Sequence, residues 1–372
     1  MLTPPRTPAN THHLTPNTSM KFGTFHLFQK PPGWGDEDVF RAELEQIEKA
    51  EELGFDAVWL AEHHFQWYGI ATDLMVIAGW VAARTQRVRI GTAIVVLPFH
   101  NPVRLAEQAA TIDVMSGGRL DFGVGRGYQA AEYAGFGISM DESRARFNES
   151  MEVLLKAWTE ETFSYDGQYT KVSEVTVLPK PVQKPHPPIY VASWMTPETI
   201  KYAAERGFPI LAPAGLASDQ IKTNYQLYRE TLQSLGRDTS NLELPALVHI
   251  YVDDNDERGQ QIGVEHSMRY GASLVTLGTP MQKGGQLSKE YEHYQEFGQA
   301  GRVVREYRQE LMLFGNPDSV ARKIQWMRDE LGVRYVMCWM NMGGLEPDKV
   351  LRSMQLFASE VMPRFKTVEA AA

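Results

Sequence analysis

The chain has 372 residues, of which 43% are hydrophobic and 22% are charged, and its formal net charge is −9. This content provides a sizeable core, and the acidic balance excludes a dominant basic surface for nucleic acid or for an anionic membrane. A single cysteine, Cys338, excludes an intrachain disulfide and any site with several cysteine ligands. We therefore expect no nucleic-acid partner and no membrane partner.

Residues 1–19 are rich in Thr, Pro and Asn and contain no apolar stretch of the kind that a secretion signal requires. No segment approaches the roughly twenty apolar residues that span a bilayer. We interpret residues 1–19 as a disordered leader, followed by one folded domain over residues 20–365 and a tail at residues 366–372. We expect a cytoplasmic protein.

From Met20 onward, short apolar runs rich in β-branched residues alternate with longer amphipathic stretches. The short runs predict strands at Lys21–Phe28, Ala57–Leu60, Val88–Leu97, Leu120–Val124, Ile189–Ala192, Ile210–Ala212, Leu247–Val252 and Arg334–Cys338. The amphipathic stretches predict helices at Asp36–Leu53, Leu74–Ala83, Pro102–Met115, Ser143–Thr159, Pro197–Arg206, Ser218–Leu235 and Pro347–Val361. Strand and helix thus follow one another about eight times.

This repeated order is typical of an α/β fold of the (β/α)8 TIM-barrel type, because neighbouring parallel strands need crossover connections. A doubly wound sheet is the alternative, but it usually stops at about five or six strands. Two segments interrupt the alternation. Phe163–Leu178 predicts an inserted hairpin around Asp166-Gly167. Gly278–Gly301 is long, polar and rich in Gly and Gln, which indicates either a missed element or a long lid loop.

Active sites of such barrels lie at the C-terminal ends of the strands. The second predicted strand is followed by Glu62, His63 and His64. These three side chains could bind zinc, as in a metal-dependent barrel hydrolase. Adjacent histidines on an extended chain point to opposite faces, however, so that only one enters a site easily. We therefore favour one general acid/base histidine oriented by a neighbouring carboxylate.

Three further strand ends carry candidate ligand-binding residues. The fourth strand leads into Gly125-Arg126-Gly127-Tyr128, where glycines permit close backbone approach and a guanidinium can pair with phosphate. The fifth leads into Ser193–Thr199, where Thr196 before Pro197 indicates a helix N-terminus that either binds phosphate or is simply capped. The third strand ends in apolar residues suited to a flat ring, and His100 follows it in a loop.

These segments resemble the bacterial luciferase family of flavin-dependent monooxygenases. The resemblance rests on motifs that lie in register from Met20 to Phe365, namely Met20–Gly23, Gly54–Phe65, Gly91–Pro98, Met115–Gly127, Pro188–Ala192, Asn316-Pro317 and Phe357–Phe365. Members of that family are (β/α)8 barrels that take reduced FMN from a separate flavin reductase. They react it with molecular oxygen to a flavin hydroperoxide and oxygenate an aldehyde, a ketone, a sulfur compound or a related small organic substrate.

The resemblance implies roles for individual residues. His63 matches the active-site histidine, Arg126 the arginine that holds the FMN phosphate, and Thr196 and Thr199 the hydroxyl groups that also bind it. A cis peptide bond is implied between Ala93 and Ile94, beneath the flavin ring. We assign catalysis to His63 with Glu62 and His64. We assign cofactor binding to Ala93, Ile94, Gly125, Arg126, Gly127, Tyr128, Trp194, Met195, Thr196 and Thr199.

Two departures concern the light-emitting members. They have a reactive cysteine where this chain has Gly125, and an acidic residue where it has Met195, so we do not expect bioluminescence. Three alternatives to a reduced-FMN monooxygenase stay open at this point: a deazaflavin- or flavin-dependent dehydrogenase of the same superfamily, the metal-dependent hydrolase that uses Glu62, His63 and His64, and a non-catalytic flavin-binding subunit. The resemblance also implies a homodimer.

Overall fold

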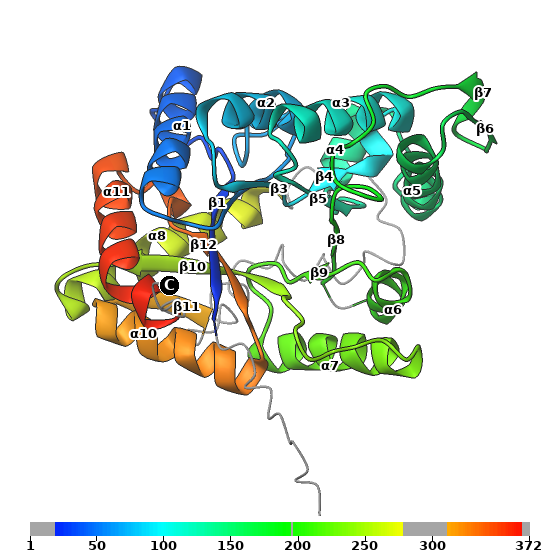
Figure 1. Cartoon of the computed structure of the whole chain (residues 1–372). Helices are drawn as coiled ribbons and strands as arrows, with labels where there is room; N and C mark the ends of the chain where they lie inside the picture. Colours follow the sequence, from blue (N-terminus) through cyan, green and yellow to red (C-terminus); the bar gives the residue numbers. More distant parts are fainter. Residues whose placement is uncertain (1–18, 195, 278–310, 367–372) are drawn as a thin grey trace, which may run out of the picture.

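The computed structural model describes residues 19–194, 196–277 and 311–366. Its central strands are surrounded by helices (Figure 1). The strands of the main sheet are β1 Lys21–His26, β2 Ala57–Leu60, β3 Arg89–Thr92, β4 Val95–Val96, β5 Leu120–Gly125, β8 Ile189–Ala192, β9 Ile210–Leu211, β10 Pro245–Val252, β11 Met312–Gly315 and β12 Tyr335–Trp339. The α-helices are α1 Asp36–Glu52, α2 Leu74–Arg84, α3 Pro102–Met115, α4 Ala130–Gly135, α5 Ser143–Thr159, α6 Pro197–Arg206, α7 Ser218–Ser234, α8 Asp256–Leu277, α10 Pro317–Trp326 and α11 Pro347–Leu356.

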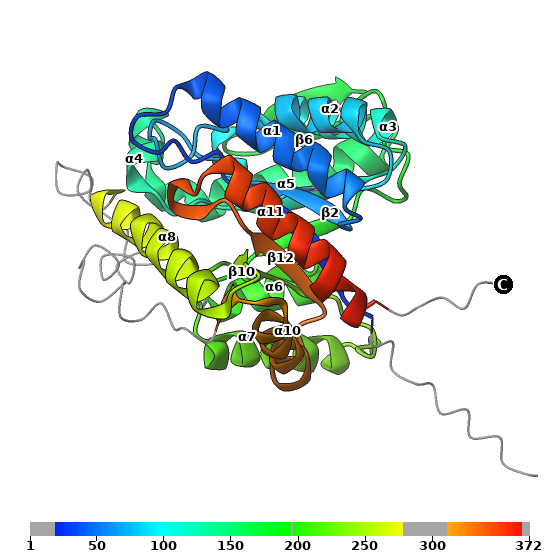
Figure 2. The same cartoon turned by 90° about the vertical axis from the view of Figure 1, so that its left-hand side faces the viewer.

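The main sheet is parallel and closes on itself. Its strands follow the order β10-β12-β1-β2-β3-β5-β8-β9, and a parallel bridge between Ala212 and Ala246 joins the two ends. A closed parallel sheet with helices outside is the predicted α/β barrel. Figure 2 shows α11 and α8 on the side of the molecule that lies at the left of Figure 1.

A tryptophan fills the barrel interior near its N-terminal end. Trp59 of β2 is fully buried and its indole N–H donates to the Tyr335 hydroxyl at 3.0 Å. A Cβ atom on Gly91 of the neighbouring β3 would lie 2.2 Å from the Trp59 ring. Only glycine leaves room for the indole at this register position, because protein interiors are close-packed and contain few voids. Trp59, which the sequence could equally place in a pocket wall, is therefore a core residue.

Several predicted elements are confirmed, and others differ, among them the short helix α4, which was not predicted. The hairpin predicted at Phe163–Leu178 is present as β6 Phe163–Asp166 and β7 Lys171–Val175, which pair antiparallel. The single strand predicted at Val88–Leu97 is instead two strands, β3 and β4, separated by a cis peptide bond between Ala93 and Ile94. The helix α8 and the strand β11 were not predicted.

The strand β11 pairs with the C-terminal half of β10, from His249 to Val252, whereas β12 pairs with the N-terminal half. It therefore adds to the sheet without entering the ring of eight strands. The predicted lid Gly278–Gly301 and the predicted leader, apart from Ser19, lie outside the described residues. Within the described helices, none combines the length and apolar character needed to cross a bilayer.

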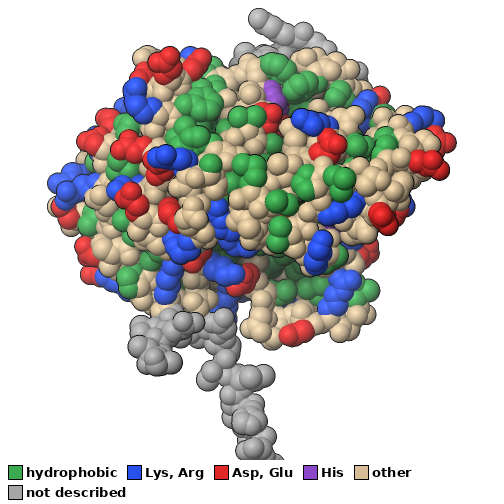
Figure 3. Space-filling view, turned by 45° about the horizontal axis from the view of Figure 1, so that its top comes forward, with side chains coloured by type: hydrophobic (Ala, Val, Ile, Leu, Met, Phe, Trp, Pro, Cys, Tyr) green, Lys and Arg blue, Asp and Glu red, His purple; other side chains and the backbone are tan. Residues whose placement is uncertain are grey.

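Acidic and basic side chains lie interspersed on the face drawn in Figure 3, with apolar side chains between them. Cys338 on β12 is buried, its thiol lies 3.8 Å from the Val336 carbonyl oxygen, and burial raises its pKa well above the ordinary value. A buried neutral thiol behaves as a small hydrophobic side chain, as the apolar surroundings of Cys338 in the sequence indicate.

Candidate active site

The two histidines after β2 point to different partners. His63 Nδ1 lies 2.9 Å from Glu132 Oε1, whereas His64 Nε2 lies 2.8 Å from Glu62 Oε1. The opposite directions follow from the extended backbone on which the histidines are neighbours. The carboxylate that contacts His63 is therefore Glu132, and not the neighbouring Glu62 that the sequence suggested.

Glu132 reaches His63 from the short helix α4, which begins five residues after Gly125. It is 1% exposed, and its Oε1 atom also accepts the backbone N–H of His64 at 2.9 Å. Because Oε1 acts as an acceptor, His63 Nδ1 is the donor of their shared hydrogen bond. Gln129 Nε2 also lies 3.1 Å from Nδ1, but an amide nitrogen cannot accept a hydrogen bond, so the Nδ1–H group donates to Glu132 and not to Gln129. His63 Nε2 is thus the ring nitrogen that takes no part in the contact with Glu132.

Glu62 forms a second buried cluster. Its side chain accepts hydrogen bonds from His64 Nε2 at 2.8 Å, from His100 Nε2 at 2.9 Å and from the backbone N–H of Val96 at 3.0 Å. Burial by itself raises the pKa of Glu62, but the hydrogen bonds from His100 and His64 outweigh it, so the pKa is lowered and the group is a carboxylate. Burial likewise disfavours the charged form of His100, and the bond to Glu62 more than offsets this and raises the pKa of His100.

Within the described residues, no group of three or more His, Cys, Asp or Glu side chains is arranged to hold a metal ion. Glu62, His63 and His64 illustrate the reason. His63 turns toward Glu132, while His64 turns toward Glu62, so the two imidazoles do not converge on one point. The zinc-hydrolase alternative loses its geometric basis here, because three ligands must face a common centre.

Three tyrosine hydroxyls extend this region toward α8. The Tyr68 and Tyr270 hydroxyls lie 2.5 Å apart, and the Tyr128 hydroxyl donates to that of Tyr68 at 3.3 Å. The Tyr68 ring meets the His63 ring edge-on at a centroid distance of 4.6 Å. Burial raises the pKa of Tyr68 well above its ordinary value and that of Tyr128 to about 12, so both remain neutral phenols. They surround His63 with weakly polar, uncharged surface.

The loop after β5 packs closely against β4. Val96 of β4 pairs with Gly125 of β5, and a Cβ atom on Gly125 would lie 2.1 Å from Ile94 Cδ1. Gly127 has φ +73°, which favours glycine, and its missing Cβ faces Val96 Cγ1. The Tyr133 hydroxyl donates to the Arg126 carbonyl oxygen. This loop therefore presents the half-buried Arg126 on a backbone that is fixed by β4 on one side and by α4 on the other.

The segment after β8 leads into the N-terminus of α6. Thr196 is the residue before the first helical residue, Pro197, as predicted, but its side chain makes no capping hydrogen bond. Thr199 lies in the first helical turn, and its N–H donates to the Thr196 carbonyl oxygen at 3.1 Å. Ser193 is buried, and within the described residues its hydroxyl has no hydrogen-bond partner. The Trp194 carbonyl oxygen accepts from Asn224 at 2.7 Å, and Met195 lies outside the described residues.

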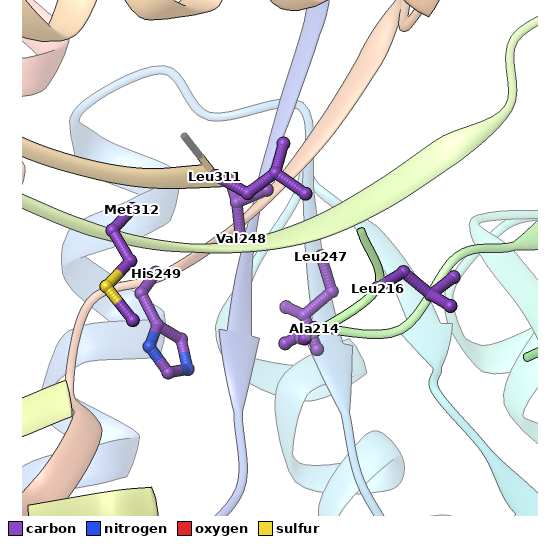
Figure 4. A pocket seen from close by; sticks show the side chains of 8 residues that line it. Ala214, Leu216, Leu247, Val248, His249, Leu311 and Met312 are labelled. Atoms are coloured by element: carbon purple, nitrogen blue, oxygen red, sulfur yellow. The ribbon is translucent and has the colours of Figure 1, made fainter. Parts of the chain in front are cut away.

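A small pocket lies between the segment that follows β9, the middle of β10 and the start of β11 (Figure 4). The residues that line it are mostly apolar: Ala214, Gly215, Leu216, Leu247, Val248, His249, Leu311 and Met312. His249 Nδ1 lies 2.6 Å from the Ser267 hydroxyl, and burial lowers its pKa to about 3, so its imidazole is neutral. The sequence placed His249 inside a strand and gave it no role, because nothing in the strand pattern shows which face meets a pocket.

Comparison with known proteins bears on this arrangement. Residues 20–335 match the family model described as luciferase-like monooxygenase. The chain belongs to this family. An alkanal monooxygenase alpha chain from the Kryptophanaron alfredi symbiont is 30% identical to it over 354 residues, which cover 93% of this chain and 99% of that one.

Solved structures agree with the family membership. The monooxygenase RslO1 from Streptomyces bottropensis has a TM-score of 0.82 and 31% identity, and the match covers 93% of this chain and 100% of that one. The oxygenating constituent of 3,6-diketocamphane monooxygenase from Pseudomonas putida, solved in complex with FMN, has a TM-score of 0.77 at 19% identity and covers 93% of this chain and 99% of that one. The second likeness concerns the fold alone.

In this luciferase-like monooxygenase, the predicted residues come to one end of the barrel in three groups. His63 with Glu132 lies after β2, Gly125–Tyr128 lies after β5 beside Ala93-Ile94, and Thr196 with Thr199 opens α6 after β8. Parallel strands of a closed sheet bring all three groups to the same face. Glu132 was the residue that sequence reasoning missed, and its helical position seven residues beyond a glycine carried no distinguishing pattern.

Proposed function

We propose that this chain is a reduced-FMN-dependent monooxygenase that receives its flavin from a separate reductase. It inserts one atom of molecular oxygen into a small organic substrate such as an aldehyde, a ketone or a sulfur compound. The observation that carries the proposal is the convergence of the His63–Glu132 pair with the Gly125–Tyr128 loop at one end of the barrel. Family membership supports it, because the matching model describes monooxygenases.

The residues present fit an FMN molecule. Gly125 and Gly127 leave room for the side chains of Ile94 and Val96, which fix the backbone on both sides of Arg126. The Arg126 guanidinium and the Thr196 and Thr199 hydroxyls at the N-terminus of α6 would hold the phosphate. The buried Ser193 hydroxyl, which has no partner within the described residues, is a further donor at this position. Bound in reduced form, the flavin would supply the electrons that activate oxygen.

The chain's own residues would control protons and water. Glu132 holds the proton on His63 Nδ1 and fixes the ring, so His63 Nε2 gives or takes the proton that the reaction requires. The carboxylate also stabilises the imidazolium form when Nε2 accepts a proton. The buried rings of Tyr68, Tyr270 and Trp339 exclude bulk water from the same region.

Reconstitution tests this proposal. The purified protein would be titrated with FMN by flavin fluorescence, then supplied with a generic flavin reductase, NADH and a panel of aldehydes, ketones and sulfur compounds. We expect saturable FMN binding and an oxygenated product from at least one class. FMN binding without an oxygen-dependent product on any substrate would favour the dehydrogenase alternative, and no FMN binding at all would reject the proposal.

The homodimer implied by the family resemblance stays a prediction, which sedimentation velocity would check.

A further inference from the structure

In the part of the chain that the structure describes, the side chains around Glu62 make no hydrogen bond with the His63 ring, and the Glu62 carboxylate is about as deeply buried as that of Glu132. The Glu62 side chain is 1% exposed, and it accepts from donors in three different segments. His64 belongs to the segment after β2, Val96 to β4, and His100 to the loop before α3. A buried carboxylate with several donors is held rigidly, because each missing donor leaves charge uncompensated in a low-dielectric interior.

The bond from Val96 links this cluster to the proposed cofactor site. Val96 N–H donates to Glu62 Oε2, and the same residue pairs with Gly125 of β5 on its other side. Its Cγ1 atom fills the space beside Gly127, where an added Cβ would lie 2.8 Å away. A shift of β4 would therefore move the backbone on both sides of Arg126. Glu62 sets the position of β4, and β4 sets the position of the glycine loop.

His100 completes the charge balance of the cluster. Its Nε2 atom lies 2.9 Å from Oε1 and 3.1 Å from Oε2 of Glu62, so it bridges both carboxylate oxygens. Its side chain is 23% exposed, whereas those of Glu62 and His64 are 1% and 9% exposed. Of these three side chains, His100 is thus the one that reaches the solvent-exposed surface.

We propose that Glu62 and His100 form a positioning pair that holds β4, and through it the Gly125–Tyr128 loop, in the geometry that binds the flavin phosphate. The pair acts through the Val96 N–H and does not itself contact the cofactor or the substrate. This inference rests on the proposed function, since it assigns the pair to the FMN site. Under this proposal, the Glu62 cluster holds β4 in position, whereas His63 transfers protons.

The test compares two substitutions at one position. His100→Gln keeps an N–H donor near the place of Nε2, whereas His100→Leu has a similar volume and no donor. We expect FMN to bind His100→Leu at least tenfold more weakly than the wild type, and to bind His100→Gln within threefold of it. His186→Gln, at the opposite end of the barrel before β8, is the matched histidine control and should bind FMN as the wild type does.

Hydrogen–deuterium exchange of the peptide that covers residues 93–99 provides a readout independent of FMN. We expect faster exchange in His100→Leu than in His100→Gln, because the Val96 N–H loses its fixed acceptor. Equal FMN affinity and equal exchange in the two variants would overturn the proposal, as would equal loss in both. If His100→Leu does not fold, Glu62→Gln, which replaces one acceptor oxygen by a donor, should show the same two effects. A wild-type protein that binds no FMN would refute the proposed function. The exchange data would still test whether the Glu62–His100 pair holds β4 in place.

Discussion

His63 depends on a carboxylate that lies 69 residues away in sequence. Glu132 accepts from both His63 Nδ1 and the His64 backbone N–H, which fixes the ring and its tautomer together. The sequence pattern identified the histidine, because an imidazole at a barrel strand end is unusual. It did not identify the partner, since a glutamate in a short helix is ordinarily a solvated residue and only the fold turns it inward.

Removing the charge of Glu132 tests this pairing. We expect Glu132→Gln to lower turnover on the order of tenfold to a hundredfold, because the imidazolium form of His63 loses its stabilising carboxylate. FMN affinity should remain unchanged, since Glu132 contacts the histidine segment and not the glycine loop. Steady-state product formation and fluorescence titration measure the two quantities. Glu149→Gln is the control, because Glu149 is also a buried acceptor of backbone N–H groups but serves the β6–β7 hairpin. Equal losses in both variants would indicate a general effect of removing a buried charge.

Arg126 carries a separate prediction about the cofactor. We expect Arg126→Ala to weaken FMN binding roughly tenfold to a hundredfold, the usual effect of losing a charge-assisted hydrogen bond to a phosphate. Binding of riboflavin, which has no phosphate, should change little. Parallel fluorescence titrations with the two flavins separate the outcomes. A similar loss for both would place Arg126 against the ring system or in a purely structural role.

For the secondary-structure elements, we expect glycine-to-alanine substitutions in β3 and in α2 to change the free energy of unfolding in opposite directions. Gly91→Ala adds a Cβ 2.2 Å from the Trp59 ring in the barrel interior, and we expect a loss of about 1–3 kcal/mol in the free energy of unfolding. Gly79→Ala in α2 meets nothing within 4 Å, and we expect a gain of about 0.5–1 kcal/mol from helix propensity. Urea denaturation of both variants checks the pair, and destabilisation by Gly79→Ala would contradict the description of α2.

The elements that sequence reasoning predicted share a strong local signal. The strand Ala57–Leu60 and the strand Ile189–Ala192 are short apolar runs with clear borders, and both occur at the predicted residues. The strand β11 has the sequence Met-Leu-Phe-Gly, which is too short for its period to distinguish strand from helix. The helix α8 contains Gly259, Gly263 and Gly271, which lower its helix propensity, and Gly263 lies against the Phe314 ring of β11.

At the scale of the whole molecule, closure of the barrel is what makes the site. The bridge between Ala212 and Ala246 joins β9 to β10 and closes the sheet, and the parallel direction of the strands brings the ends of β2, β5 and β8 to one face. From the sequence alone, the order of strands and helices predicted this face and most of its residues. It could not predict the contacts of Glu62, because which carboxylate meets which histidine depends on loop paths of atomic precision.

The reaction proposed for this protein is the transfer of one atom of molecular oxygen to an organic substrate with reduced FMN. Its most direct test is to run the reconstituted reaction under ¹⁸O₂ and to determine the mass of the product. We expect one ¹⁸O atom in each product molecule, and a severe loss of this product in His63→Ala while FMN still binds. A product that forms equally well without oxygen, or that carries only oxygen from water, would contradict it.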